Sequence, residues 1–354
     1  MRPKFLLIAL SALMFNVIFA SAVTAATGLN TFAVLGTGSL LSLLPLVPAG
    51  SFGMAVQKEI WMNSIVEGLF ADNSFLSKAF NADEFVNAGK TVHIPNAGAA
   101  SNVVKNRTSF PATVTARTDS DLDFNLDEFT TDPIKIANAD KVELSYNKRE
   151  SVIKTDKAKL IEDVSNDMLF NWSPAVAYTI RTTGAAVAGH TVNAAGNRKL
   201  FTKADVRTAM GKFNAKDIPQ DGRYMIVDAE MYGQLLDSLT TQESMAFHSL
   251  VDIKNGVLGK LYTFNFMMRS KAGLYTTAVA PKLWAAAAAA TDNAAALCWH
   301  ENSVCRALGQ TEMFENPNNP LYYADIYSFL VRAGGRPMRS GVEGLLAIVQ
   351  DASV

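Results

Sequence analysis

Cysteine and histidine, which often hold metals or take part in catalysis, are scarce in this sequence. The 354 residues include two cysteines and four histidines. Cys298 and Cys305 lie seven residues apart, wider than the usual spacing of paired metal ligands, and a second pair is missing. His300 lies between them, so a weak metal site is the alternative to two buried thiols. We expect no metal and no cofactor.

An excess of charge of either sign is also absent. The chain has 32 basic and 33 acidic side chains and a formal net charge of -1. A protein that reads nucleic acid normally has a basic excess on the reading element. Hydrophobic residues make up 49% and charged residues 18%, which is too apolar for disorder and suggests that much of the surface is covered. If the protein encloses nucleic acid, we expect it to do so without sequence-specific binding.

The common catalytic motifs are missing as well. The sequence contains no Gly-x-Ser-x-Gly elbow, no phosphate loop and no His-Glu-x-x-His helix. Asp121 and Asp123 form a carboxylate pair, but they alternate with apolar residues, as on the solvated face of a strand. We therefore expect a protein that is not an enzyme.

The first 53 residues differ in character from the rest. Arg2 and Lys4 precede an apolar run over residues 5–20, small residues follow, and a second apolar run covers 32–47. A secretory signal peptide has this layout. Three interpretations stay open: an export signal, a propeptide lost in maturation, or upstream sequence before a start at Met54. We expect no stable membrane partner for the mature chain.

From Met54 the sequence changes to that of a folded domain. Residues 56–70 place apolar side chains at helical spacing, and a short helical turn follows near Phe75. From 86 to 150 the period becomes two, as where Leu122, Phe124 and Leu126 alternate with acidic residues. These patterns predict an N-terminal arm followed by a long two-stranded loop.

The charges of that loop are separated by sign. Residues 86–118 carry four bases and no acid, whereas residues 119–132 carry six acids and no base. One interpretation is a plain antiparallel ribbon with balanced faces, in which each cross-strand pair contributes roughly 0.2–1 kcal/mol. The other is a protruding loop that docks on an oppositely charged neighbour. A two-stranded ribbon is marginally stable alone in water, which favours a partner.

Helical spacing returns over residues 153–172, with charged residues mainly on the opposite face, and predicts a long amphipathic helix. Val176 and Ile180 could extend it. Further along, Thr202 is a predicted helix cap, and residues 223–227 are a predicted buried strand with a helix after Asp228. We also expect strands at 261–268, 274–279, 322–332 and 342–349, the last two flanking Gly334-Gly335-Arg336-Pro337, and a helix or tightly packed segment over the alanine run 285–290.

The order of these parts resembles the coat proteins of tailed bacteriophages, whose fold is named after the phage Hong Kong 97. Several stretches are similar to sequence motifs of this family: Glu59-Ile60-Trp61, Phe110-Pro111, Phe129-Thr130-Thr131, Glu143 to Lys148, Pro219 to Tyr224 with Asp228 to Tyr232, and Val331 to Val342. The resemblance covers about residues 55–350. The apolar leader departs from it, because family members usually carry a charged helical segment there.

The resemblance implies an α+β fold with defined parts. They are an apolar leader (1–53), an N-terminal arm (54–85), an extended two-stranded loop (86–150), a peripheral domain with a spine helix (151–200), an axial domain (201–320) and C-terminal strands that return to the peripheral domain (321–354). It also implies a homo-oligomeric major capsid protein whose hexamers and pentamers form an icosahedral shell around double-stranded DNA. Scaffold, portal and maturation protease would be its partners, and the virion would assemble in the bacterial cytoplasm.

Six side chains are our candidates for contacts between subunits: Trp61 and Phe70 on the arm, and Arg107 and Arg117 against Asp121 and Asp123 on the extended loop. Their partners should come from neighbouring copies. Two other functions stay open. An exported bacterial surface or cell-envelope protein would start near residue 26, and an encapsulating compartment of the same fold in a cellular host would enclose a cargo enzyme.

Overall fold

The computed structural model describes residues 65, 68–69, 73–87, 90–96, 102–111, 114, 120–137, 148–339 and 341–353. The chain divides into two compact units, Met1–Trp61 and Met62–Val354. The predictions for the leader, and those for Trp61, Phe70 and Arg117, lie outside the described residues. Within the described part, no helix is both long and apolar enough to span a membrane.

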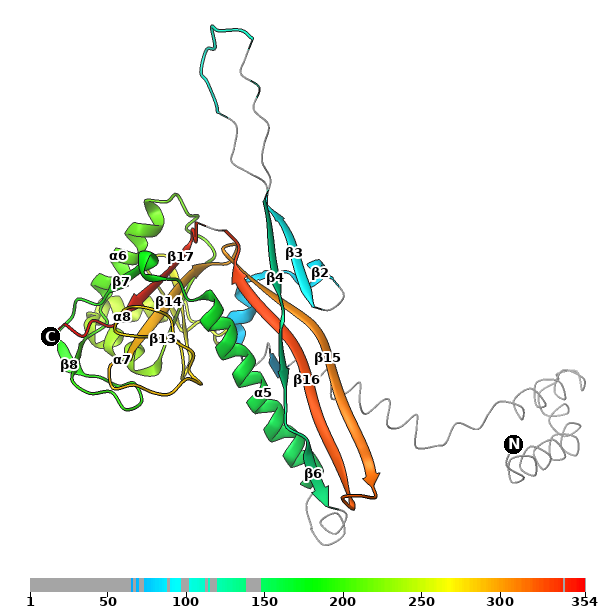
Figure 1. Cartoon of the computed structure of the whole chain (residues 1–354). Helices are drawn as coiled ribbons and strands as arrows, with labels where there is room; N and C mark the ends of the chain where they lie inside the picture. Colours follow the sequence, from blue (N-terminus) through cyan, green and yellow to red (C-terminus); the bar gives the residue numbers. More distant parts are fainter. Residues whose placement is uncertain are drawn as a thin grey trace, which may run out of the picture. The chain divides into compact units, whose positions relative to one another are not determined.

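Two long antiparallel strands form the centre of the first sheet (Figure 1). They are β15 (Val304–Asn319) and β16 (Ala324–Pro337), and their register shifts between Leu308 and Thr311 and again between Asn316 and Asn319. Three short strands complete this sheet: β1 (Phe80–Asn81) on β15, and β5 (Asp127–Thr130) and β6 (Ile134–Ala137) on β16.

The helix α5 (Lys148–Trp172) runs beside β16, as Figure 1 shows. Its apolar positions recur every three or four residues, so they form one stripe, which is buried: Ile153, Leu160, Ile161, Val164, Met168, Leu169 and Trp172. The Trp172 indole nitrogen donates a 3.0 Å hydrogen bond to the Cys305 carbonyl oxygen on β15. A β-carbon at Gly335 would lie 2.7 Å from that same nitrogen, so β16 needs glycine at this point.

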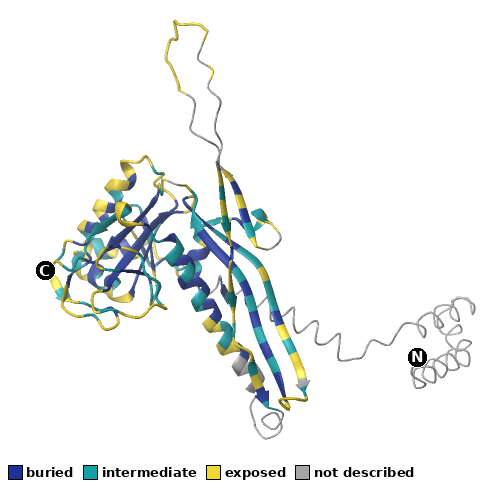
Figure 2. Ribbon diagram, viewed as in Figure 1, coloured by how far each residue is buried: buried dark blue, intermediate teal, exposed yellow. Residues whose placement is uncertain are grey.

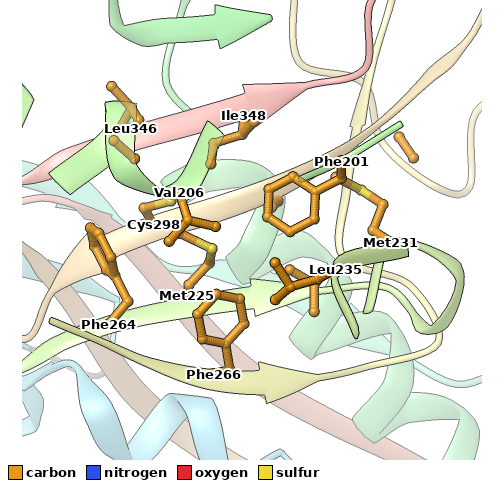
Figure 3. Close-up of a cluster of buried hydrophobic side chains, with 14 of the residues drawn as sticks. Phe201, Val206, Met225, Met231, Leu235, Phe264, Phe266, Cys298, Leu346 and Ile348 are labelled. Atoms are coloured by element: carbon orange, nitrogen blue, oxygen red, sulfur yellow. The ribbon is translucent and has the colours of Figure 1, made fainter. Parts of the chain in front are cut away.

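The second sheet has the strand order β11-β12-β10-β14-β17-β7, with β13 paired to β14. Its strands are β7 (Thr179–Arg181), β10 (Arg223–Val227), β11 (Gly259–Leu261), β12 (Phe264–Met268), β13 (Gly273–Tyr275), β14 (Asn293–His300) and β17 (Leu345–Val349). Three helices accompany it: α6 (Lys203–Asn214), α7 (Ala229–Ser238) and α8 (Thr241–His248). Figure 3 shows the apolar core, where side chains from α6 and α7 meet those of β10, β12, β14 and β17.

Polar residues cap the three helices. Asp205 accepts hydrogen bonds from the backbone amide and the hydroxyl of Thr202 at the start of α6. Asp228 accepts a 2.7 Å bond from the Met231 amide at the start of α7, and Thr240 and Glu243 form a capping box on α8. These caps satisfy amides that have no partner within the helix, which fixes where each helix begins.

The remaining elements are short. The strands β2 (Val86–Asn87), β3 (Thr91–Asn96) and β4 (Ser120–Asn125) form a three-stranded sheet, and β8 (Ala186–Ala188) pairs with β9 (Asn197–Lys199). Single 3-10 turns are η1 (Ser74–Lys78), η2 (Asp83–Phe85), η3 (Val176–Tyr178) and η4 (Ile253–Asn255).

The structure confirms the predicted α+β class, the long helix and the strand-to-helix passage at Asp228. Of the two-stranded loop predicted over residues 86–150, β3 and β4 form an antiparallel pair, whereas β5 and β6 join the first sheet on β16. Three local predictions are wrong. Val176 and Ile180 do not extend α5, because Ile180 pairs with Ile348 in a parallel strand. Residues 285–290 form an exposed irregular segment and not a helix. Gly334 to Pro337 do not separate two strands, because they lie inside β16. The division into axial and peripheral domains stays a prediction.

Candidate assembly interface

The extended ribbon of β3 and β4 is anchored in the protein at its base. Val92, Ile94 and Leu126 are buried in one cluster with Cys305 and Ala307 of β15. The partners in register, such as Val92 with Phe124, place apolar side chains on one face of the ribbon. The ribbon is therefore held by a core of its own at the base, and only its outer part projects.

The outer face of the ribbon carries polar pairs between the strands. Asp123 lies opposite His93, and the His93 Nδ1 is 2.6 Å from the Asp123 Oδ1. Thr91 donates a 3.0 Å hydrogen bond to the Asn125 side chain. Both side chains of the His93–Asp123 pair are about half exposed, so this pair adds little stability, and the sheet register depends mainly on the buried face.

Beyond β3 the chain enters an exposed segment that includes residues 102–111. Val103 is 91% exposed and Phe110 is 77% exposed. This segment also carries the exposed Lys105 and Arg107 and contains no acid. Large exposed apolar side chains beside exposed positive charge are typical of a surface that contacts a partner. We call residues 102–111 the basic loop.

The structure describes three of the six predicted contact residues, Arg107, Asp121 and Asp123, and all three are exposed. Within the described residues no ion pair joins Arg107 to either aspartate. In the ladder of β3 and β4, Asp123 lies opposite His93 and Asp121 lies opposite Pro95. Their predicted contacts with other copies stay a prediction.

An acidic groove, which the sequence analysis missed, runs between α5 and the short strands β5 and β6. It has a volume of about 580 Å³, and Glu128, Asp132, Asp156 and Asp163 contribute carboxylates to its lining. Two of these carboxylates are paired: Asp163 lies 2.8 Å from the Lys159 ammonium, and Glu128 lies 2.9 Å from the Arg332 guanidinium. A second groove of about 500 Å³ shares Phe129, Lys159 and Asp163 with it. The two grooves therefore form one continuous depression along α5, which we call the acidic groove.

The pKa values of two carboxyls in this groove are raised. Burial raises the pKa of Asp156, and its Oδ2 is buried without a hydrogen-bond partner. Burial and then the nearby Asp127 raise the pKa of Asp167, although Asn171 donates a 2.7 Å hydrogen bond to it. A cation placed in this groove would stabilise the charged forms of both carboxyls. The acidic groove is therefore suited to a positively charged partner.

The two cysteines are buried and free, as the interpretation as thiols predicted. Burial raises the pKa of both thiols, to about 11 for Cys305. A protonated thiol is a poor nucleophile and a poor metal ligand. Across the described ranges, no group of three or more His, Cys, Asp or Glu residues is arranged to hold a metal ion.

The sequence matches no family model and no curated protein. The fold, however, is similar to that of solved capsid structures. The capsid of cyanophage Pam1 is 12% identical and aligns over 78% of this chain and 89% of its own, with a TM-score of 0.54. The capsid of Ralstonia phage GP4 is 11% identical over 78% and 88% of the two chains, with a TM-score of 0.53.

A virus-like particle from Pyrococcus furiosus is also similar. It is 7% identical over 82% of this chain and 99% of its own, with a TM-score of 0.50. The identities are low, so these comparisons define the fold and not the activity. The chain has the Hong Kong 97-type fold of tailed-phage capsid proteins, which confirms the resemblance seen in the sequence.

Proposed function

We propose that this chain is the major capsid protein of a tailed bacteriophage, a structural protein and not an enzyme. Its copies form hexamers and pentamers of an icosahedral head that encloses double-stranded DNA. The single observation that carries the proposal is the shared fold with phage capsids over more than three quarters of the chain. The balanced net charge is compatible with enclosing DNA without sequence-specific binding.

The basic loop and the acidic groove supply the contact between neighbouring copies in this proposal. The loop carries Lys105 and Arg107 and exposed apolar side chains, while the groove carries the unsatisfied Asp156. Opposite charges on two surfaces steer them together and fix their orientation more than they raise affinity. A loop that is exposed in one copy would thus become covered in the shell.

Charge reversal tests this contact. Lys105→Glu combined with Arg107→Glu should reduce the yield of closed shells at least tenfold, because both positive charges of the basic loop become negative. Arg207→Glu on the exposed side of α6 is the matched control and should leave the yield unchanged. Sedimentation of the assembled fraction measures both.

A compensating change sharpens the test. Asp132 lines the groove and is exposed, so Asp132→Lys should restore part of the yield of the double variant. An unchanged yield in the double variant would count against the docking role of the loop but would leave the capsid function standing.

The fate of the leader, residues 1–53, distinguishes a capsid protein from an exported surface or cell-envelope protein. Mass spectrometry of the intact protein from purified particles gives the first residue of the mature chain. A phage head with its maturation protease predicts either a full chain or a start near Met54. A start near residue 26, in protein found in the cell envelope, would favour export.

The similarity to the Pyrococcus furiosus particle supports a second candidate function, a protein compartment in a cellular host. The content of purified particles decides between the two. Nuclease-resistant DNA, together with scaffold, portal and protease genes next to this one, supports the phage head. A packaged enzyme without DNA would support the compartment.

A further inference from the structure

We infer that copies of this chain associate head to tail through the second sheet. An apolar knob at its β11 edge would insert into a pocket beside its β7 edge on the next copy. The knob consists of Met245, Leu250, Val251 and Ile253. The pocket lies between α6, β17 and the segment before β7. This inference rests on the proposed assembly into rings and names the surfaces that would form them.

The pocket is small and mainly apolar. It has a volume of about 280 Å³, and Phe213, Ile218, Leu345 and Leu346 are among the side chains that line it. Tyr178 forms part of the wall, and the Lys216 ammonium lies 4.9 Å from the centre of its ring. A branched aliphatic side chain occupies on the order of 100 Å³, less than half of this volume. The pocket therefore has room for one or two such side chains.

The knob presents the matching surface. Ile253 is 80% exposed, Met245 73% and Leu250 59%, although α8 itself is firmly held. Phe247 on α8 is buried against the β11–β12 hairpin, where a β-carbon on Gly259 would come within 2.6 Å of its ring. The apolar side chains around it are thus displayed on a rigid base. Several large exposed apolar groups in one short segment indicate a contact surface.

The topology shows that the knob cannot fill the pocket of its own chain. β11 and β7 are the two ends of the strand order, five strand spacings apart. At about 4.8 Å per spacing, the two edges are separated by roughly 24 Å. A knob and a pocket on opposite edges of one sheet make a heterologous contact between copies. Such contacts close into rings when the rotation between copies divides the full circle.

Charge complementarity supports a second copy as the occupant. Asp252 lies between Val251 and Ile253 in the knob, where its carboxylate accepts hydrogen bonds from Asn255, and Lys212 and Lys216 line the pocket. The Lys212 ammonium is 3.4 Å from the Thr179 carbonyl oxygen, near the mouth of the pocket. An inserted Ile253 would bring Asp252 toward these lysines, which fixes the direction in which the knob enters.

Disulfide trapping tests the contact on the assembled full chain. Ile253→Cys and Ala215→Cys place one thiol on the knob and one in the pocket wall. Oxidation of this double variant should yield a ladder of covalent dimers, trimers and larger rings on a non-reducing gel. Each single variant should stay monomeric on the gel, because Cys298 and Cys305 are buried.

A control pair of cysteines tests whether another exposed apolar side chain occupies the pocket instead. Leu321, in the turn between β15 and β16, is 83% exposed. Leu321→Cys with Ala215→Cys should give no ladder; a ladder from this pair and none from the first would overturn the inference. Dimers from Ile253→Cys alone would show that the knob meets its own copy and would also overturn it.

A second measurement does not depend on cysteines. Ile253→Asp should weaken association tenfold or more, because it removes a buried aliphatic side chain and places a carboxylate in the pocket. Its melting temperature as a monomer should not change, since the side chain is exposed there; Leu321→Asp is the control. If shells form equally well with Ile253→Asp, the contact is wrong and the capsid function survives. If the unaltered chain forms no rings or shells, both fail.

Discussion

The two sheets of this protein differ in how completely a single copy covers them. Every residue of β14 and β17 in the second sheet is buried, whereas β16 in the first sheet alternates between buried and half-buried positions. Figure 2 shows this as continuous dark blue strands in the one and mixed colours in the other. The second sheet is complete in one copy, and the first leaves one face for something else to cover.

Both regions contain buried polar groups, and they differ in how well these groups are satisfied. Arg223 at the start of β10 is fully buried, and its guanidinium bonds to the carbonyl oxygens of Pro219 and Ile218 and to Thr263. By contrast, the side-chain amides of Asn293 on β14 and of Gln350 after β17 are buried without a hydrogen-bond partner, as is one oxygen of Asp156 beside the first sheet. Natural proteins rarely leave such groups unsatisfied, and assembly is one way to satisfy them. We expect stability to reside in the second sheet and assembly to depend on the first sheet, the ribbon and the edges.

The largest expected effect comes from a cavity in the second sheet. Phe266→Ala should lower the free energy of unfolding by about 3–5 kcal/mol, because Phe266 is buried against Phe247 with ring centres 5.5 Å apart. Phe110→Ala in the basic loop should change it by less than about 0.5 kcal/mol. Urea denaturation followed by circular dichroism measures both, and equal losses would break the comparison.

A smaller effect is expected where the two regions meet. Arg269, which follows β12, donates hydrogen bonds of 2.6 Å to Ser165 and 2.7 Å to Asn166 on α5. Burial lowers its pKa to about 10, so it stays charged at neutral pH. Arg269→Ala should cost about 2–3 kcal/mol, because the buried Ser165 and Asn166 lose their hydrogen bonds to a charged group. If the Arg269→Ala variant unfolds in two separate calorimetric transitions, Arg269 couples the unfolding of the two regions.

Trp172 supplies a narrower test within the first region. Trp172→Phe keeps an aromatic ring beside Trp299 and removes the bond to the Cys305 carbonyl oxygen. A hydrogen bond of this kind contributes about 0.5–1.5 kcal/mol, so unfolding should occur at correspondingly lower urea concentration. An unchanged midpoint would show that this bond does not hold α5 on the sheet.

The smallest effect depends on pH. Burial opposes the charge of Asp351, but hydrogen bonds from Lys199 and Ser353 outweigh it and lower the pKa of this carboxyl from 3.8 to about 2. The stabilisation is therefore complete above about pH 4 and disappears as the pH falls toward 2. Asp351→Asn should cost about 1 kcal/mol at pH 6 for this partly exposed pair, and nothing near pH 2. A cost that does not vary with pH would contradict the ion pair.

The elements that the sequence predicts correctly have one exposed and one buried face. α5 shows a helical period because only one stripe of it is covered, and β4 alternates for the same reason. β14 gives no such signal, since both of its faces are buried and its alanines suit a helix equally well. β15 was missed because its register shifts twice, so its side chains keep no single period.

The candidate interface was predictable in part. The alternation over residues 120–125 predicted a strand, which β4 confirms, but the acidic residues of β4 lie opposite β3 (Thr91–Asn96), which carries none of the four bases. The acidic groove could not be read from the sequence, because Asp156 and Asp163 appear there as the solvent face of a helix. The knob and pocket depend on which strands lie at the edges of a sheet, and the strand order is a tertiary property.

Electron microscopy of the purified full chain, with sedimentation to give the mass of the particles, tests the central claim most directly. The account predicts closed shells of uniform diameter or rings of five and six copies, and it predicts that the charge-reversed loop variants form fewer of them. A protein that stays monomeric at every concentration, also when co-expressed with its neighbouring genes, would contradict the proposal that this chain is a capsid protein.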